Sequence, residues 1–130
     1  MNKLIPSEEY PVTPYFTVKD ADRLIAFACT VFGAVVVKEN RYDNGTVQHV
    51  RLQIGKSLLM LNETTDAFPA NVSQMYLRVK DAEAVYAHAL REGAVSLMEP
   101  NDRPFGARMA GIKDPCGNVW WIATPISHAQ

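Results

Sequence analysis

A pair of adjacent tryptophans is the feature of this sequence that points most directly to a binding site. Trp120 and Trp121 follow a turn signal, Asp-Pro-Cys-Gly-Asn at 114–118, and open a segment with the pattern of a β-strand. Neighbouring side chains on a strand point to opposite faces of the sheet, so we expect Trp120 in the core and Trp121 on the other face. An indole ring in that position can stack on a planar molecule or attract a cation.

The same alternation predicts which other side chains share the face of Trp121. In the first strand, expected over 12–18, the residues Val12, Phe16 and Val18 lie on the core side. The opposite side carries a mixture of aromatic, apolar and polar residues, namely Thr13, Tyr15, His49, Leu58, Met60, Asn62, Gln74, Tyr76 and Trp121. Such a mixture is typical of a small-molecule cavity, because the polar members would be hard to satisfy in a dry core. A second core or a contact between two copies of the chain remains the alternative interpretation.

Two side chains are further candidates for contacts with a ligand. His49 is the one histidine expected on this face, and it could act as a general base near neutral pH. No second acid or nucleophile is identifiable beside it, and a lone histidine on a strand is more often structural, so no catalytic residue is predicted. Arg108 could meet an anionic ligand or form a surface salt bridge. Its direction is left open, because Gly106 and Gly111 can introduce bulges that change the alternation.

A repeat in the sequence predicts the elements that position these residues. The segment YFTVKDA at 15–21 returns as YLRVKDA at 76–82, with five identical positions. Each copy follows the order strand, helix and three strands, which predicts an α+β fold of two βαβββ modules sharing one core. The expected boundaries are 1–130 for the single domain, 12–62 for the first module, 63–72 for the linker and 73–125 for the second module.

Aspartates mark the starts of the two expected helices. Asp20 and Asp81 each precede apolar residues at helical spacing, and both are expected to act as N-caps. Gly33 and Gly93 are expected to end these helices. In the second module the strand after the helix is expected at 94–99.

The composition excludes several classes of partner. Hydrophobic residues make up 48% of the 130 residues, charged residues 21%, and the formal net charge is −1. No block of lysine and arginine suggests a nucleic-acid surface, and no apolar run is long enough for a membrane helix. The first residues lack the pattern of a signal peptide, and Cys29 and Cys116 form no CxxC motif, so a cytoplasmic protein with reduced thiols is expected.

Three segments resemble the vicinal oxygen chelate superfamily, which contains glyoxalases, bleomycin resistance proteins and extradiol dioxygenases. They read VTPYFTVKDADRLIAFACTVFGA, YLRVKDAEAVYAHALREGA and GARMAGIKDPCGNVWWIAT, and the resemblance covers about residues 12–125. The small PhnB-like members, with an Asp-Pro-x-Gly turn before x-x-Trp-x-Ala-Thr, are the most similar branch. The resemblance implies eight strands in a mixed sheet that curls around a cleft, and it implies a homodimer.

Metal-using members of this superfamily take four ligands from the cleft face. The positions that match them here are Thr13, Met60, Gln74 and Trp121. Only Gln74 offers a suitable donor, because an indole, a thioether and a threonine hydroxyl are poor ligands for zinc, nickel or magnesium. We therefore expect neither a metal nor another cofactor.

The resemblance and the missing ligands together imply a function. We expect metal-independent binding of a small, partly aromatic or cationic molecule, as in the members that sequester drugs. The expected ligand-binding set is Thr13, Tyr15, His49, Met60, Gln74, Tyr76, Arg108 and Trp121. One alternative is a metal-dependent lyase, isomerase or dioxygenase whose ligands are displaced by a slip of one residue in a strand. The other alternative is a non-enzymatic interaction module without a small ligand.

Overall fold

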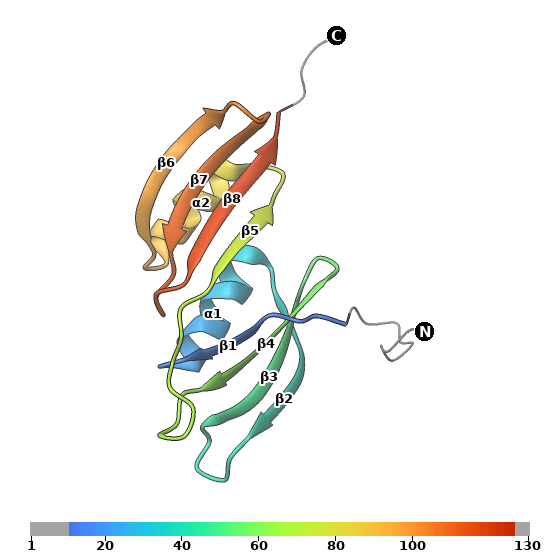
Figure 1. Ribbon diagram of the computed structural model, residues 1–130, viewed down its shortest axis with the longest axis vertical. Helices are drawn as coiled ribbons and strands as arrows, with labels where there is room; N and C mark the ends of the chain where they lie inside the picture. Colours follow the sequence, from blue (N-terminus) through green and yellow to red (C-terminus); the bar gives the residue numbers. More distant parts are fainter. Residues whose placement is uncertain (1–10, 127–130) are drawn as a thin grey trace.

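The computed structural model describes residues 11–126, which form two helices and eight strands (Figure 1). The first module contains β1 (Tyr15–Val18), α1 (Ala21–Phe32), β2 (Val35–Arg41), β3 (Val47–Ile54) and β4 (Ser57–Glu63). The second module contains β5 (Gln74–Arg78), α2 (Ala82–Arg91), β6 (Val95–Arg103), β7 (Ala107–Lys113) and β8 (Val119–Pro125). This order confirms the α+β fold and the repeated βαβββ pattern.

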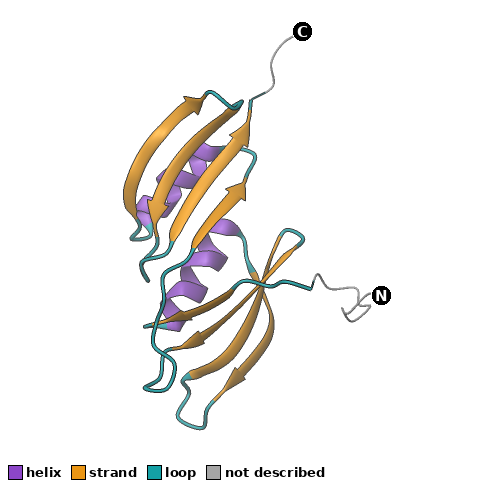
Figure 2. Cartoon of the chain, in the orientation of Figure 1, coloured by secondary structure: helices purple, strands orange, loops and turns teal. Residues whose placement is uncertain are grey.

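The eight strands are arranged in two mixed sheets of the same topology. The first sheet has the order β1-β4-β3-β2 and the second has the order β5-β8-β7-β6. In each sheet the first strand of the module pairs in parallel with the last, and the other neighbours are antiparallel. Each helix covers one face of its own sheet (Figure 2). We call the opposite face of each sheet its open face.

The helix-covered sides of the two modules meet in one core. Trp120, which is 3% exposed, stacks on Phe16 of the first module with ring centres 6.1 Å apart and also packs against Phe32. The Trp120 indole donates a hydrogen bond of 2.8 Å to the buried carboxylate of Asp114. The prediction that Trp120 is a core residue is therefore confirmed. Because the modules join through their helix sides, the two open faces lie away from this shared core.

Polar contacts also join the modules near the start of α1. The Arg23 guanidinium donates to the carbonyl oxygen of Glu92 at 3.3 Å, and the Cys116 thiol lies 3.4 Å from the carbonyl oxygen of Lys19. Burial is the largest cause that raises the pKa of the Cys116 thiol to about 11, followed by the nearby carboxylate of Asp114. Cys116 is thus a neutral thiol that packs between the modules, and its chemistry gives no sign of a nucleophile.

Two strand boundaries differ from the prediction. β1 begins at Tyr15 rather than at residue 12, and Val12 is 82% exposed instead of lying on the core side. Pro14 has no amide hydrogen to donate, although its carbonyl oxygen accepts a hydrogen bond from Met60 at 2.9 Å, so regular pairing starts only after it. β6 continues to Arg103, because its pairing with β7 resumes after a register shift between Met98 and Asn101.

The N-terminus of α1 is capped from a neighbouring strand rather than by Asp20. Asp20 adopts a left-handed conformation with φ of 69° and makes no side-chain cap. The Glu63 carboxylate instead accepts hydrogen bonds of 2.8 Å from the backbone amides of Asp20 and Ala21. Glu63 lies at the end of β4 and pairs with Val18, which precedes Asp20 by two residues. This pairing brings the Glu63 carboxylate to the start of α1. The expected cap at α2 is present, since Asp81 accepts from the amide of Ala84 at 3.1 Å.

Candidate ligand-binding faces

The first open face brings together three of the expected site residues. Side chains of directly paired residues share one face of a sheet, so the strand register shows which residues lie together. One row across the first sheet contains Tyr15, Met60, Arg51 and Lys38. His49 follows from the next row, two residues from Arg51 on β3, and Thr13 precedes β1 on the same edge.

Hydrogen bonds fix the polar side chains of this face. The Tyr15 hydroxyl lies 3.2 Å from Nδ1 of His49, and Thr17 donates to the Asn62 side chain at 2.8 Å. Burial is the main cause that lowers the pKa of His49 from its ordinary value of 6.5, and the charges of Arg51 and Lys38 lower it further. The imidazole is therefore neutral at neutral pH, and its Nδ1 can accept the hydroxyl hydrogen of Tyr15 while Nε2 donates.

The second open face is built around Trp121. A row across the second sheet contains Tyr76, Trp121, Gly111 and Met98. The Trp121 indole nitrogen donates a hydrogen bond of 2.6 Å to the side-chain oxygen of Gln74, two residues along β5 from Tyr76. These contacts bring the expected residues Gln74, Tyr76 and Trp121 together on one face.

Gly111 leaves the space that the Trp121 ring occupies. A Cβ atom at residue 111 would overlap Cζ3 of Trp121 and would lie 2.8 Å from its Cε3. The indole therefore lies over the backbone of β7 at a position that only glycine can leave clear. The sequence alone indicates Gly111 only as a possible bulge. The signal that could have identified it is a glycine directly opposite a large aromatic residue on the adjacent strand.

Arg108 does not lie with the other expected site residues. Its guanidinium donates hydrogen bonds to Glu83 of α2 at 2.6 Å and to Asp102 of β6 at 3.0 Å. These contacts place the side chain on the helix side of the second sheet, away from Trp121. Of the two interpretations left open for Arg108, the structure matches the salt bridge.

The four positions that match metal ligands in the resemblance do not supply a donor set for a divalent ion. Thr13 and Met60 provide a hydroxyl and a thioether, and the side-chain oxygen of Gln74 already accepts the Trp121 hydrogen. Zinc, nickel and magnesium need several oxygen or nitrogen donors that converge on one point. Within residues 11–126, no group of three or more His, Cys, Asp or Glu side chains is placed to hold a metal. These residues do not fit the ion that metal-dependent members use.

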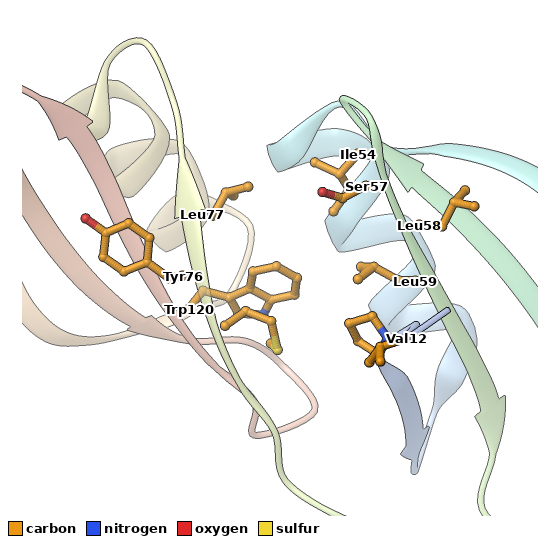
Figure 3. A pocket seen from close by; sticks show the side chains of 10 residues that line it. Val12, Ile54, Ser57, Leu58, Leu59, Tyr76, Leu77 and Trp120 are labelled. Atoms are coloured by element: carbon orange, nitrogen blue, oxygen red, sulfur yellow. The ribbon is translucent and has the colours of Figure 1, made fainter. Parts of the chain in front are cut away.

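The structure also contains cavities at the junction of the modules, which the sequence did not predict. One of about 270 Å³ lies between Leu58 and Leu59 of the first module and Tyr76, Leu77 and Trp120 of the second (Figure 3). Of the expected ligand-binding residues, Tyr76 is the only one that lines it. The cavity depends on how two segments that are distant in sequence pack together, so no local sequence pattern predicts it.

The two repeated βαβββ modules define the class of protein: a two-module α+β domain with one open face on each sheet. The chain belongs to the Glyoxalase/Bleomycin resistance protein/Dioxygenase superfamily, whose family model matches residues 12–122. This confirms the family that the sequence segments resemble. Within the described residues, neither helix is long and apolar enough to cross a membrane.

Individual relatives are distant in sequence. An uncharacterised protein of Mycobacterium bovis is 26% identical over 133 aligned positions, covering 94% of this chain and 88% of the relative. The PhnB protein of Bacillus cereus has 18% identity and a TM-score of 0.68, covering 88% of this chain and 99% of that one. TnmS3, an antibiotic binding protein from Streptomyces sp. CB03234, has 20% identity and a TM-score of 0.67, covering 92% and 99%. At these identities the solved structures show a shared fold.

Proposed function

We propose that this protein binds a small planar molecule on its open faces without a metal ion, as a resistance or sequestration factor does. The observation that carries the proposal is the 2.6 Å hydrogen bond from the Trp121 indole to Gln74. It occupies the side-chain oxygen of Gln74, the one suitable donor among the four candidate ligand positions, and it holds an aromatic ring where metal-using members place a carboxylate. An indole supports stacking rather than coordination.

The surroundings of Trp121 support a binding site with a preformed aromatic surface. Gln74 holds the indole nitrogen and Gly111 leaves room for the ring, so the side chain is positioned before any ligand arrives. Tyr15 on the first open face is 45% exposed, and Tyr76 on the second open face is 44% exposed. The shared fold of TnmS3, described as an antibiotic binding protein, is consistent with this class of function.

The proposal includes a homodimer in the cytoplasm. The modules of one chain join through their helix sides, at the stacked rings of Phe16 and Trp120, so the first open face does not cover the second. A second copy can bring its own first sheet over the second sheet of this chain and form a cleft between them. Cys29 and Cys116 are both free thiols, as expected in a reducing compartment.

The test is a calorimetric titration with planar probes of matched size: 2-naphthol, 2-naphthoate and 2-naphthylmethylammonium. We expect at least one probe to bind the chelator-treated protein, and we expect Trp121→Ala to lower its affinity by about tenfold, the range for loss of one aromatic contact. Phe105→Ala removes an aromatic side chain that is 62% exposed at the β6–β7 turn, and it should leave the affinity unchanged.

Each alternative function predicts a different result in the same experiment. A metal-dependent lyase, isomerase or dioxygenase would bind its probe only after a divalent ion is restored. An interaction module would bind none of the probes. If a probe binds but Trp121→Ala has the affinity of the unchanged protein, the proposed site is wrong.

A further inference from the structure

We propose that the junction between the modules is a second binding site, specific for a small amphipathic carboxylate. The observation behind it is a pair of adjoining cavities, one apolar and one flanked by two cations. They lie beside the shared core, between β4 and β5, and the proposal does not depend on the function proposed for the open faces.

The first cavity has the lining of a pocket for an apolar group. It measures about 270 Å³, and its walls are Val12, Pro14, Ile54, Ser57, Leu58, Leu59, Met75, Tyr76, Leu77 and Trp120. Figure 3 shows Tyr76, Leu77 and Trp120 on one side and Val12, Leu58 and Leu59 on the other, with open space between them. This volume suits a phenyl ring or a short hydrocarbon chain.

The second cavity adjoins the first and carries the charge. It measures about 380 Å³ and shares Ile54, Ser57, Tyr76 and Leu77 with the apolar cavity. Its further lining includes Lys56, in the β3–β4 turn, and Arg78, at the end of β5. A molecule with its apolar body in the first cavity can therefore place a polar head between these two side chains.

The charges at the second cavity favour an anionic head. The residues that line the two cavities include no Asp or Glu. Among residues 11–126, neither Lys56 nor Arg78 forms an ion pair, and Arg78 instead lies 5.0 Å from the centre of the Tyr76 ring. Two cations without a carboxylate partner at the mouth of an apolar cavity can bind a carboxylate by charge-assisted hydrogen bonds.

The arginines on the helix side differ from Lys56 and Arg78, because their charges are paired with carboxylates. Arg41 bonds Asp22 at 2.6 Å, and Arg108 bonds both Glu83 and Asp102. These guanidinium groups are neutralised within the fold, whereas Lys56 and Arg78 have no carboxylate partner among the described residues and can bind one from outside. The carboxylate is assigned to the second cavity for this reason.

The experiment compares three probes with the same apolar body: 4-phenylbutyrate, 4-phenyl-1-butanol and 4-phenylbutylammonium. Each is titrated into the full chain by calorimetry at low ionic strength. We expect 4-phenylbutyrate to bind about twofold to fivefold more tightly than either of the others, because a single partly exposed ion pair supplies that order of discrimination. Equal affinities, or no binding of 4-phenylbutyrate, would overturn the proposal.

Variants at the cavity test its location. Lys56→Gln should weaken the binding of 4-phenylbutyrate about twofold to fivefold, and Lys80→Gln, which removes an equal charge two residues beyond Arg78, should have no effect. Ser57→Phe places a ring in the open space shared by the two cavities and should abolish binding. Unchanged affinity in Lys56→Gln and Ser57→Phe would assign the probe to another site and overturn the proposal. None of these variants alters Trp121 or Gln74, so failure here leaves the proposed function standing.

Discussion

At the scale of single residues, the chemistry available on the second open face depends on the hydrogen bond between Gln74 and Trp121. The amide oxygen of Gln74 accepts the indole hydrogen at 2.6 Å, so that oxygen is already occupied. A metal at this position would have to break that bond and gain no second donor from the indole. Under the proposed function, tryptophan at this ligand position favours stacking over coordination.

His49 provides the residue-scale prediction. Its imidazole should titrate below 6.5 in the folded protein, because burial and the charges of Arg51 and Lys38 all disfavour the charged ring. Lys38→Gln removes one of those charges, so the pKa of His49 should rise toward its ordinary value. NMR titration of the ring C–H signals measures both values.

The same shift gives the sign of a pH effect on stability. Because the pKa of His49 is lower in the folded chain, the unfolded chain binds more protons as the pH falls below about 6.5. The contribution of His49 to stability is therefore present above that pH and is lost on acidification through the folded pKa.

Lys80→Gln, distant from this face, should leave the titration of His49 unchanged. A His49 pKa at or above 6.5 would contradict the described environment.

At the scale of elements, the pairing of β7 with β8 positions the aromatic surface. Gly111 lies directly opposite Trp121 in the antiparallel ladder, so the ring rests over the backbone of β7. The parallel pairing of β5 with β8 places Gln74 within reach of the indole from the other side. Three neighbouring strands therefore hold one side chain, and the ring orientation depends on all of them.

Gly111→Ala tests this arrangement. The added methyl group must displace the indole, so the Gln74 hydrogen bond is lost and the affinity for the naphthalene probe falls about as far as in Trp121→Ala. Overpacking of this kind costs about 1–3 kcal/mol of unfolding free energy, which urea denaturation measures.

A double variant provides the control for that prediction. In Gly111→Ala/Trp121→Ala the clash is gone, so its unfolding free energy should exceed the value expected from adding the two single effects. Strict additivity would show that the ring does not rest on Gly111.

The elements themselves were largely predictable from the sequence, and the reason is physical. Strand alternation and the repeated YFTVKDA and YLRVKDA segments depend on neighbours along the chain, so both modules and the core position of Trp120 could be predicted. The direction of Arg108, the cap from Glu63 and the room left by Gly111 depend on residues that are distant in sequence. Such contacts follow from the register between strands, which local patterns do not specify.

At the scale of the whole molecule, the junction of the modules decides where a ligand can be enclosed. The helix sides share one core through Phe16, Phe32 and Trp120, and each sheet keeps an open face. Within one chain the two open faces are therefore separate surfaces, apart from the cavities at the junction of the modules. In the proposed homodimer, a second copy closes the cleft by placing its first sheet over the second sheet of this chain.

Mixed dimers test that arrangement. Chains carrying Tyr15→Ala and chains carrying Trp121→Ala are co-expressed with different tags, and the heterodimer is purified through both. If each site combines the first sheet of one copy with the second sheet of the other, the heterodimer contains one intact site and binds the naphthalene probe at half the wild-type stoichiometry. Each variant homodimer should bind weakly.

Two outcomes would contradict the dimeric site. A heterodimer without any intact site would place both faces of the site within one chain. A monomeric mass in sedimentation analysis at the concentration of the binding experiment would remove the second copy altogether.

The metal content of the protein tests the central claim most directly. Protein purified without chelator, and again after incubation with nickel, zinc or manganese, is analysed by elemental mass spectrometry at known protein concentration. The donor set of Thr13, Met60, Gln74 and Trp121 predicts far less than one ion per chain in every sample. About one tightly held divalent ion per chain would contradict the account. It would support the alternative function, a metal-dependent enzyme of the superfamily.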